Sequence, residues 1–505
     1  MSSYSEMMKE NEFDDLLKGC MEELPPSDIV EGVTPWKQAM NRILWGLALT
    51  TITFQFYCLD YILPAVGMLL MLLGFRALRK ENVWFKVSWA VILVRCVYFF
   101  GNLILNTTIY RNEIQAFSIV EIVFVVFLSL TFVQIFCLWM GIREVQKKAD
   151  LQPKAGAALG LLIWNGIICL LAVVGIVDWF FFGVLLFAYI LIIRSLYKLS
   201  KELDEAGYVI ETSMLQLSDR NLITVILIVL TIGMGSGYLF FNSYTMDWRP
   251  FEVSTDAKVV EIKAQLIELG FPQEVLQDVT EADVLACEGA LRVVVQEHIY
   301  PVNEGRVVRN EGAAATVFST VYDVKELRIT GIAVELPDER ETWKIFHHFE
   351  WDVNPGFYGT ESIQLWTAYD LLQEGWTSAS DLSGHVLYNK GEDVYVSSYE
   401  SISRETYISN NFLFGEQSNT ELFATFSLPD NGERQRGYLS YAVNEVNDGW
   451  LIDTWINYTH QQHGVQYPVQ TAKENRISDS WNTAGTFILI QDALQFNPNQ
   501  EIDSH

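Results

Sequence analysis

The chain has 505 residues, half of them apolar, with a mean hydropathy of +0.17 and yet a formal net charge of −28. A single globular domain rarely combines these values, so the chain is divided by composition. Residues 1–37 carry three lysines against nine acids, residues 38–246 carry 15 basic residues against 12 acids, and residues 247–505 carry 16 against 41. The apolar excess lies in the middle block. The acidic ends argue against binding of nucleic acid or other anionic polymers.

The first 37 residues are predicted to form an acidic tail with one short amphipathic helix. Its apolar face, at helical spacing, consists of Phe13, Leu16, Leu17, Cys20, Met21 and Leu24. Asn11 can cap this helix, and Pro25 with Pro26 ends it. The opposite face is acidic, which argues against docking on an anionic membrane surface. We expect residues 11–24 to bind either the basic loops of the same chain or a cytoplasmic protein.

Seven apolar stretches follow, each close to the roughly 20 residues that cross a bilayer. They lie near 38–58, 61–79, 84–105, 115–139, 156–177, 179–197 and 221–243. All should be helical, because lipid offers no hydrogen-bond partner to exposed backbone groups. The sequence therefore predicts an all-α bundle of seven transmembrane helices at residues 38–246, embedded in a lipid bilayer.

Basic residues gather at alternate ends of these spans. The clusters are Lys37 and Arg42; Arg76, Arg79, Lys80 and Lys86; Arg143, Lys147, Lys148 and Lys154; and Arg194, Lys198, Lys201 and Arg220. Cytoplasmic loops of membrane proteins are enriched in Lys and Arg. We therefore expect a multi-pass plasma-membrane protein with a cytoplasmic N-terminus and with residues 247–505 outside the membrane.

Two charged residues lie within the predicted spans. Arg95 is near the middle of span three, and Glu121 is about two turns from the outer end of span four. A charge at this depth is unfavourable unless paired, so we predict that the two side chains form a polar pair. The pair suits either a proton or ion path, with Asn102, Gln134 and Asn165 as possible relays, or a single buried structural contact.

Residues 247–505 are predicted to form an extracytoplasmic α+β domain, mainly antiparallel β. Apolar residues at three- and four-residue spacing predict helix over 256–300, whereas period-two alternation predicts strands over 314–470. Turn signals occur at Asn389-Lys390-Gly391 and at Asn447-Asp448-Gly449. A short C-terminal helix is expected near 482–495.

The stretch "WDVNPGFYGTESIQLW" is the candidate ligand loop of this domain, because proline and glycines interrupt regular structure between aromatic residues. Its candidate binding residues are Trp351, Pro355, Phe357, Tyr358, Glu361 and Trp366. Aromatic rings with interspersed acids suit an envelope glycan or peptide ligand. They suit a hydrophobic core equally well, and both interpretations stay open.

The sequence contains no known catalytic or metal-binding motif. The chain has no H-E-x-x-H, no G-x-S-x-G and no D-x-D-x-D-G loop. No catalytic residue, metal ligand or cofactor is therefore predicted.

Four segments resemble a family of uncharacterised polytopic membrane proteins from Gram-positive bacteria. They are "TPWKQAMNRILWGLALTTIT", "YILPAVGMLLMLLGFRAL", "YTMDW" and "ALRVVV". The resemblance implies a membrane location and no particular activity. The layout of tail, membrane helices and outer domain is also similar to that of membrane-bound anti-sigma factors, although their H-x-x-x-C-x-x-C zinc motif is absent.

Three functions are consistent with these features. The first is an envelope sensor or regulator that couples an outer ligand-binding β domain to a cytoplasmic partner. The second is a transporter or channel subunit that uses Arg95 and Glu121. The third is a membrane-tethered sugar-binding or hydrolytic module.

Overall fold

The computed structural model describes residues 35–54, 56, 58–115, 118–175, 179–208, 210, 218–302, 306–311, 316–321, 325–337, 342–366, 375–411, 415–446, 449–478 and 485–499. Contacts divide the chain into two compact units. Unit 1 comprises Met1–Leu105 and Asn112–Met234, and unit 2 comprises Asn106–Arg111 and Gly235–His505. The tail helix predicted at residues 11–24 lies outside the described residues.

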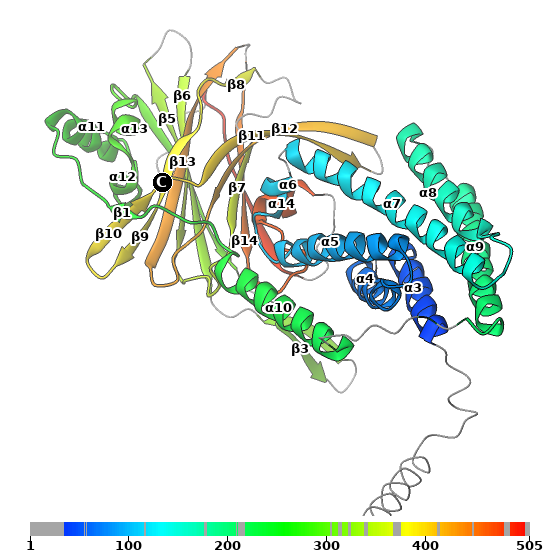
Figure 1. Ribbon diagram of the computed structural model, residues 1–505. Coiled ribbons are helices and arrows are strands. Elements are labelled where there is room, and N and C mark those ends of the chain that lie inside the picture. Colours follow the sequence, from blue (N-terminus) through cyan, green and yellow to red (C-terminus); the bar gives the residue numbers. More distant parts are fainter. Residues whose placement is uncertain are drawn as a thin grey trace, which may run out of the picture. The chain divides into compact units, whose positions relative to one another are not determined.

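Helices account for nearly all of the described part of unit 1 (Figure 1). They are α3 (Pro35–Thr51), α4 (Leu59–Leu78), α5 (Val83–Leu105), α6 (Arg111–Gln115), α7 (Ser118–Lys148), α8 (Gly156–Val174), α9 (Trp179–Glu205) and α10 (Asp219–Phe240). Within the described residues, α4, α5, α7, α8, α9 and α10 are long and apolar enough to cross a membrane. The first expected span, α3, has only 17 residues, so the count of seven spans stays a prediction.

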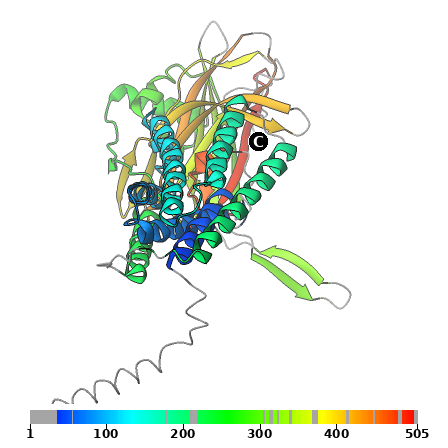
Figure 2. The same ribbon diagram turned by 45° about the vertical axis from the view of Figure 1, so that its right-hand side comes forward.

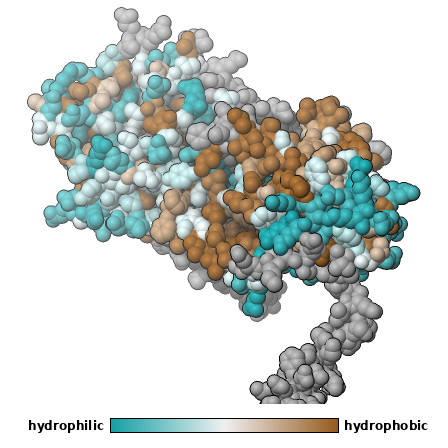
Figure 3. All heavy atoms as spheres, in the orientation of Figure 1, coloured by the Kyte–Doolittle hydropathy of each residue, from teal (hydrophilic) through white to brown (hydrophobic). Residues whose placement is uncertain are grey.

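Large apolar side chains are exposed on these helices (Figure 3). Val173 of α8 is 86% exposed and Phe187 of α9 is 64% exposed. Soluble proteins rarely expose apolar surface continuously. The helices of unit 1 are therefore compatible with a lipid bilayer.

The helices of unit 1 pack in sequence order, from α3 and α4 through α5, α7 and α8 to α9, which contacts α3 again. The tightest crossing is between α3 and α4, where a Cβ on Gly46 would lie 2.7 Å from the Gly67 carbonyl oxygen. Small residues allow such close approach of helix backbones in membranes. Tyr189 of α9 donates to the Leu47 carbonyl oxygen of α3 at 2.8 Å.

Unit 2 is built on two antiparallel sheets and a separate hairpin. The large sheet contains β1 (Arg249–Pro250), β10 (Asp393–Ser397), β9 (Ser383–Lys390), β13 (Glu433–Glu445), β6 (Thr342–Trp351), β5 (Glu326–Leu336) and β2 (Arg292–Pro301), with β8 (Trp376–Ser378) beside β13. The small sheet contains β11 (Ser401–Asn411), β12 (Gly415–Phe426), β7 (Glu361–Trp366), β14 (Ile452–Gln461) and β15 (Phe487–Phe496). The hairpin pairs β3 (Arg306–Glu311) with β4 (Thr316–Val321) and stands apart from both sheets (Figure 2). The antiparallel β prediction is confirmed.

The two sheets pack face to face as a sandwich. Strand alternation directs Ile345 and Phe349 of β6 towards Ile363 and Leu365 of β7, and all four side chains are essentially inaccessible to solvent. This core supplies the main hydrophobic stabilisation of unit 2.

Three short helices cover the other face of the large sheet (Figure 1): α11 (Ala257–Glu268), α12 (Gln273–Asp278) and α13 (Glu281–Leu285). Asp256 caps α11 by accepting a hydrogen bond from the Lys258 amide at 2.7 Å. Gly270 lies just after α11 and has a φ of +98°. Residues with a side chain rarely adopt this left-handed conformation, so a glycine here allows the helix to end. The apolar face of α11 then packs on Phe346 of β6.

Two of the expected helical segments are strands. The helix prediction over 256–300 fails after Leu285, because Arg292–Pro301 is strand β2 paired along its length with β5. Its run of three valines suits the pleated sheet better than a helix. The helix expected near 482–495 is also wrong: Phe487–Phe496 is β15, with Ile490 and Leu494 turned inwards. The C-terminal helix is instead α14 (Ala472–Ile477).

Candidate functional site

Arg95 contacts a neutral partner in unit 1. Its guanidinium on α5 donates to the Gln134 side-chain oxygen on α7. Glu121 lies 13 positions before Gln134 on α7, about 20 Å along the helix axis. The Glu121 side chain is outside the described residues, so its pairing with Arg95 stays a prediction. From the sequence, Gln134 is expected only as a possible relay.

The structure separates the residues of the candidate ligand loop. Trp351 and Glu361 face the sandwich core, where the Trp351 indole donates to Tyr458 Oη at 3.2 Å and Glu361 Oε1 lies 2.7 Å from His460 Nδ1. Burial raises the pKa of the Glu361 carboxyl, although the charge and hydrogen bond of His460 oppose the shift. These two residues belong to the hydrophobic core, which is the second of the two interpretations left open for this loop.

The three middle residues of the loop lie in the connection between β6 and β7. Pro355 is buried, and Tyr358 packs partly buried against the sandwich core. Phe357 packs beside Gly464, where an added Cβ would come within 3.1 Å of its ring. This connection therefore contacts the loop that follows β14.

Trp366 alone among the loop residues belongs to the other face of the small sheet. It joins a group of polar and aromatic side chains that we call the α14 cluster, consisting of Gln364, Trp366, Tyr407, Glu421, Trp455, Asn457 and Arg476. The Glu421 carboxylate accepts hydrogen bonds from the side chains of Gln364 and Trp366 and, at 2.6 Å, from Tyr407. Burial and the adjacent Glu421 both raise the pKa of the Tyr407 phenol.

The alternation of β7 explains this placement. Ile363 and Leu365 point into the sandwich, so Gln364 and Trp366 project from the opposite face. Gln364 Oε1 accepts from Arg476 Nε at 2.5 Å and from Asn457 Nδ2 at 2.9 Å. The Gln364 amide thereby links three separate elements of the chain.

Helix α14 lies across this face and brings two cations to it. The Arg476 guanidinium lies 6.0 Å from the Trp366 ring centre. Lys473 Nζ lies 2.6 Å from Glu405 Oε1 and 2.9 Å from Ser403 Oγ. Burial alone would raise the pKa of Glu405, but the hydrogen bond and charge of Lys473 lower it below its ordinary value. The six-residue helix begins with a reciprocal capping box between Thr471 and Glu474.

Three buried polar atoms on the same face have no hydrogen-bond partner among the described residues. They are Ser362 Oγ, Asn457 Oδ1 and Thr459 Oγ1. Buried polar atoms are usually satisfied by protein or by ordered water. These buried hydroxyl and amide groups in and beside the α14 cluster are of the kind that ordered water satisfies.

A second feature of unit 2 connects this region to two helix ends. We call it the junction, and define it as Asn106–Arg111, Gly235–Tyr244 and Gln462–Thr471. The Val469 amide donates to the Asn106 carbonyl at 2.8 Å, and Tyr238 Oη donates to the Gln466 carbonyl at 2.6 Å. A Cβ on Gly237 would come within 2.9 Å of Thr107 Cβ, so the chain segments approach closely there.

The junction is joined to the small sheet through the start of α14. Thr360 Oγ1, just before β7, accepts a hydrogen bond from the Ala472 amide at 2.9 Å. Thr360 also donates, through its amide, to Gln461 Oε1 at 2.8 Å. Ser427 Oγ bridges the Gly359 carbonyl at 2.6 Å and the Tyr244 amide at 2.9 Å. No motif in the sequence marks these long-range contacts.

A buried polar network also fixes the helices α12 and α13 to the large sheet. Asp278 accepts from His348 Nε2 at 3.0 Å and from Arg436 Nε at 2.8 Å. Asp283 lies 2.9 Å from Lys344 Nζ. Burial opposes ionisation of both carboxyls, but His348 and Arg436 for Asp278, and Lys344 for Asp283, hold each pKa below its ordinary range. The sequence did not indicate this network.

In the part of the chain that the structure describes, the protein has six membrane-compatible helices followed by an antiparallel β-sandwich. No family model matches the chain, and no curated protein matches it.

Among solved structures, one described as a pore forming protein shares 10% identity with a TM-score of 0.18, covering 41% of this chain and 91% of that chain. The membrane-inserted form of the Clostridium perfringens NetB toxin gives 9% identity and a TM-score of 0.16, covering 40% of this chain and 97% of that chain. AvmM, which catalyses macrocyclization in alchivemycin A biosynthesis, gives 10% and 0.15, covering 32% and 84%. TM-scores this low do not show a shared fold or a shared activity.

Proposed function

We propose that the chain is a membrane-embedded sensor whose β-sandwich binds a neutral polar ligand, of the glycan or peptide type, at the α14 cluster. The observation that carries the proposal is the double attachment of α14. Its side chains hold Gln364 and Glu405 on the small sheet, and its first amide is bonded to Thr360 just before β7. Its other attachment is covalent, because α14 directly follows the junction segment Gln462–Thr471.

The chemistry of the cluster suits a sugar or an amide-rich peptide. Trp366 and Trp455 lie 6.3 Å apart at a steep angle and present aromatic surface beside amide and guanidinium donors. Aromatic rings with a few placed polar groups are typical of small-ligand sites. The 41 acids of residues 247–505 disfavour a polyanionic ligand.

Coupling to the membrane helices would proceed through the junction. A ligand that competes for Gln364 removes the hydrogen bond of Arg476 and loosens α14. Since Val469 and Gln466 lie only a few residues before α14 and are bonded to Asn106 and Tyr238, the change reaches the segments that continue into α5 and α10. In this proposal residues 247–505 are extracytoplasmic, and the acidic tail binds a cytoplasmic partner.

The test uses the full chain in lipid nanodiscs and a panel of neutral cello-, xylo- and chito-oligosaccharides. We expect at least one sugar to change tryptophan fluorescence and to alter hydrogen exchange of residues 235–244 and 462–471. Trp366→Ala should abolish both responses, whereas Trp450→Ala, which removes a well-exposed tryptophan, should retain them. Binding that leaves exchange in the junction unchanged would refute sensing. Absence of any sugar response would refute the glycan ligand.

A further inference from the structure

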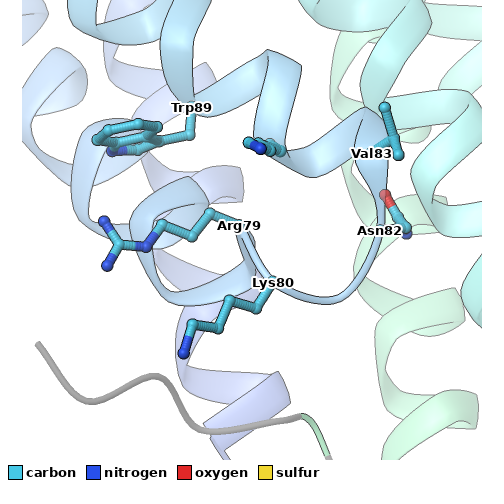
Figure 4. Close-up of a pocket in the computed structure, with 6 residues that line it drawn as sticks. Arg79, Lys80, Asn82, Val83 and Trp89 are labelled. Carbon is cyan, nitrogen blue, oxygen red and sulfur yellow. The ribbon is translucent and has the colours of Figure 1, made fainter.

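A basic pocket opens at the turn between α4 and α5 in unit 1. It is lined by Arg79, Lys80, Asn82, Val83, Lys86 and Trp89, and its volume is about 540 Å³ (Figure 4). Arg79 and Lys80 directly follow α4, Asn82 directly precedes α5, and Val83, Lys86 and Trp89 lie on the first two turns of α5. We call it the basic pocket.

The three cations of this pocket have no acidic partner among the described residues. The acid in the same turn, Glu81, points elsewhere: it accepts from Tyr208 Oη at 2.6 Å and lies 3.8 Å from Lys148 Nζ. By contrast, Arg42 and Arg76 of the same unit both pair with Asp219. Among the described residues, the three positive charges of the basic pocket are therefore not neutralised by an acid.

Two neighbouring residues give the pocket a fixed shape. The Arg79 guanidinium lies 5.3 Å above the Trp89 ring centre, a cation–π contact that orients it without neutralising its charge. Asn82 accepts from the Phe85 amide at 2.9 Å and donates to the Gly141 carbonyl at 3.1 Å. These bonds start α5 and tie it to α7, so the turn that carries the cations is anchored at both sides.

We propose that the basic pocket binds the phosphate of an anionic phospholipid headgroup. Helices α4 and α5 are both long and apolar enough to span a bilayer, so their adjoining ends lie at headgroup depth. Basic pockets at such ends, accompanied by tryptophan, favour anionic lipids. The phosphate oxygens accept hydrogen bonds from Arg79, Lys80 and Lys86, and the glycerol and acyl ester region covers the apolar surface of Trp89 and the exposed Val83.

The experiment measures bound lipid on the full chain in detergent by native mass spectrometry, with phosphatidylglycerol or phosphatidylcholine added. We expect phosphatidylglycerol to bind more tightly. Lys86→Gln should weaken it about fivefold, and Arg79→Gln together with Lys86→Gln about 25-fold, since each basic group near a surface contributes about that factor. Lys86 is exposed and Arg79 is half-buried, and neither has an ion pair among the described residues, so these changes should leave the fold intact.

Arg143→Gln is the matched control. Arg143 lies 5.1 Å from the Trp139 ring centre, in the same kind of stack, but does not line the basic pocket. Its substitution should change phosphatidylglycerol affinity less than twofold. Equal losses in Arg143→Gln and in the pocket variants would overturn the proposal, because they would indicate general charge attraction.

Two further experiments test other possible occupants of the basic pocket. Inorganic phosphate that displaces phosphatidylglycerol at equal concentration would make free phosphate the ligand and overturn the lipid assignment. The acidic tail is tested in the full chain by Asp14→Asn, Asp15→Asn, Glu22→Gln and Glu23→Gln together. If only this variant binds phosphatidylglycerol, the tail fills the basic pocket and the proposal fails; unchanged binding supports it.

Discussion

Asp283 shows how a single carboxylate organises the interior of unit 2. It accepts hydrogen bonds from Tyr438 Oη at 2.7 Å and from Ser383 and Ser440 Oγ, each at 2.9 Å, and it pairs with Lys344. The carboxylate and the ammonium are both nearly inaccessible to solvent. Buried charges are tolerated only when paired and hydrogen-bonded, so this network fixes α13 in one position on the large sheet.

We expect Asp283→Asn to lower the free energy of unfolding by about 3–5 kcal/mol, because it leaves the Lys344 ammonium buried without a counter-charge. Adding Lys344→Met should restore much of that loss. Glu288→Gln, which breaks a solvent-exposed pair with Lys258, should change stability by less than about 1 kcal/mol. Denaturant unfolding of the full chain in detergent, followed by tryptophan fluorescence, measures all four proteins. Equal effects of Asp283→Asn and Glu288→Gln would contradict the buried-charge explanation.

At the scale of elements, α14 is too short to be stable by itself. Isolated helices of six residues do not persist in water, so α14 depends on its cap and on its contacts with the small sheet. Thr471 supplies the cap by accepting from the Glu474 amide at 3.2 Å.

Thr471→Ala should therefore lower stability by about 1 kcal/mol and raise hydrogen exchange over residues 466–477. Thr471→Ser keeps the hydroxyl and should behave like the native chain. The measurement is hydrogen exchange with mass spectrometry on the full chain. The role given to α14 would be wrong if Thr471→Ala left exchange in that segment unchanged.

Elements with a strong local signal in the sequence could be predicted. Of the seven predicted spans, six correspond to helices of spanning length and character among the described residues, and the turn at Asn389-Lys390-Gly391 joins β9 and β10 as an antiparallel hairpin. The similar signal before Gly449 separates β13 from β14, which belong to different sheets. Turn residues predict where the chain reverses direction. They do not predict which strand the following strand pairs with, because that depends on long-range packing.

The α14 cluster could not be predicted for the same reason. Gln364, Tyr407, Glu421, Asn457 and Arg476 come from five elements spread over more than a hundred residues, so no local spacing connects them. Trp366 was identified by its aromatic character alone. The face on which it lies follows from its register with Trp455, which only strand pairing reveals.

At the scale of the whole molecule, the chain passes between the units at Leu105, Arg111 and Met234. Helix α10 belongs to both, with Gly233 beside Ile104 in unit 1 and Gly237 beside Thr107 in unit 2. The covalent connections between the two units run through these segments. The two units can also differ in their response to solution conditions, because buried titratable networks are concentrated in unit 2.

Acid should destabilise unit 2 well before its carboxyls protonate. Burial lowers the pKa of His347 to about 3 and of His385 to about 4, whereas unfolded histidine titrates near 6.5. Below pH 6.5 these histidines are protonated in the unfolded chain but stay neutral in the folded chain. The free energy of unfolding therefore falls by roughly 3 kcal/mol per histidine by pH 4. Asp278 and Asp283, with lowered pKa values, add a further loss at still lower pH. Glu361, whose pKa is raised, offsets part of this loss.

Denaturant unfolding at pH 7, 5.5 and 4.5 should show this fall in the free energy of unfolding, and His347→Gln should make the fall smaller. A free energy of unfolding that stays constant over this range would exclude buried neutral histidines.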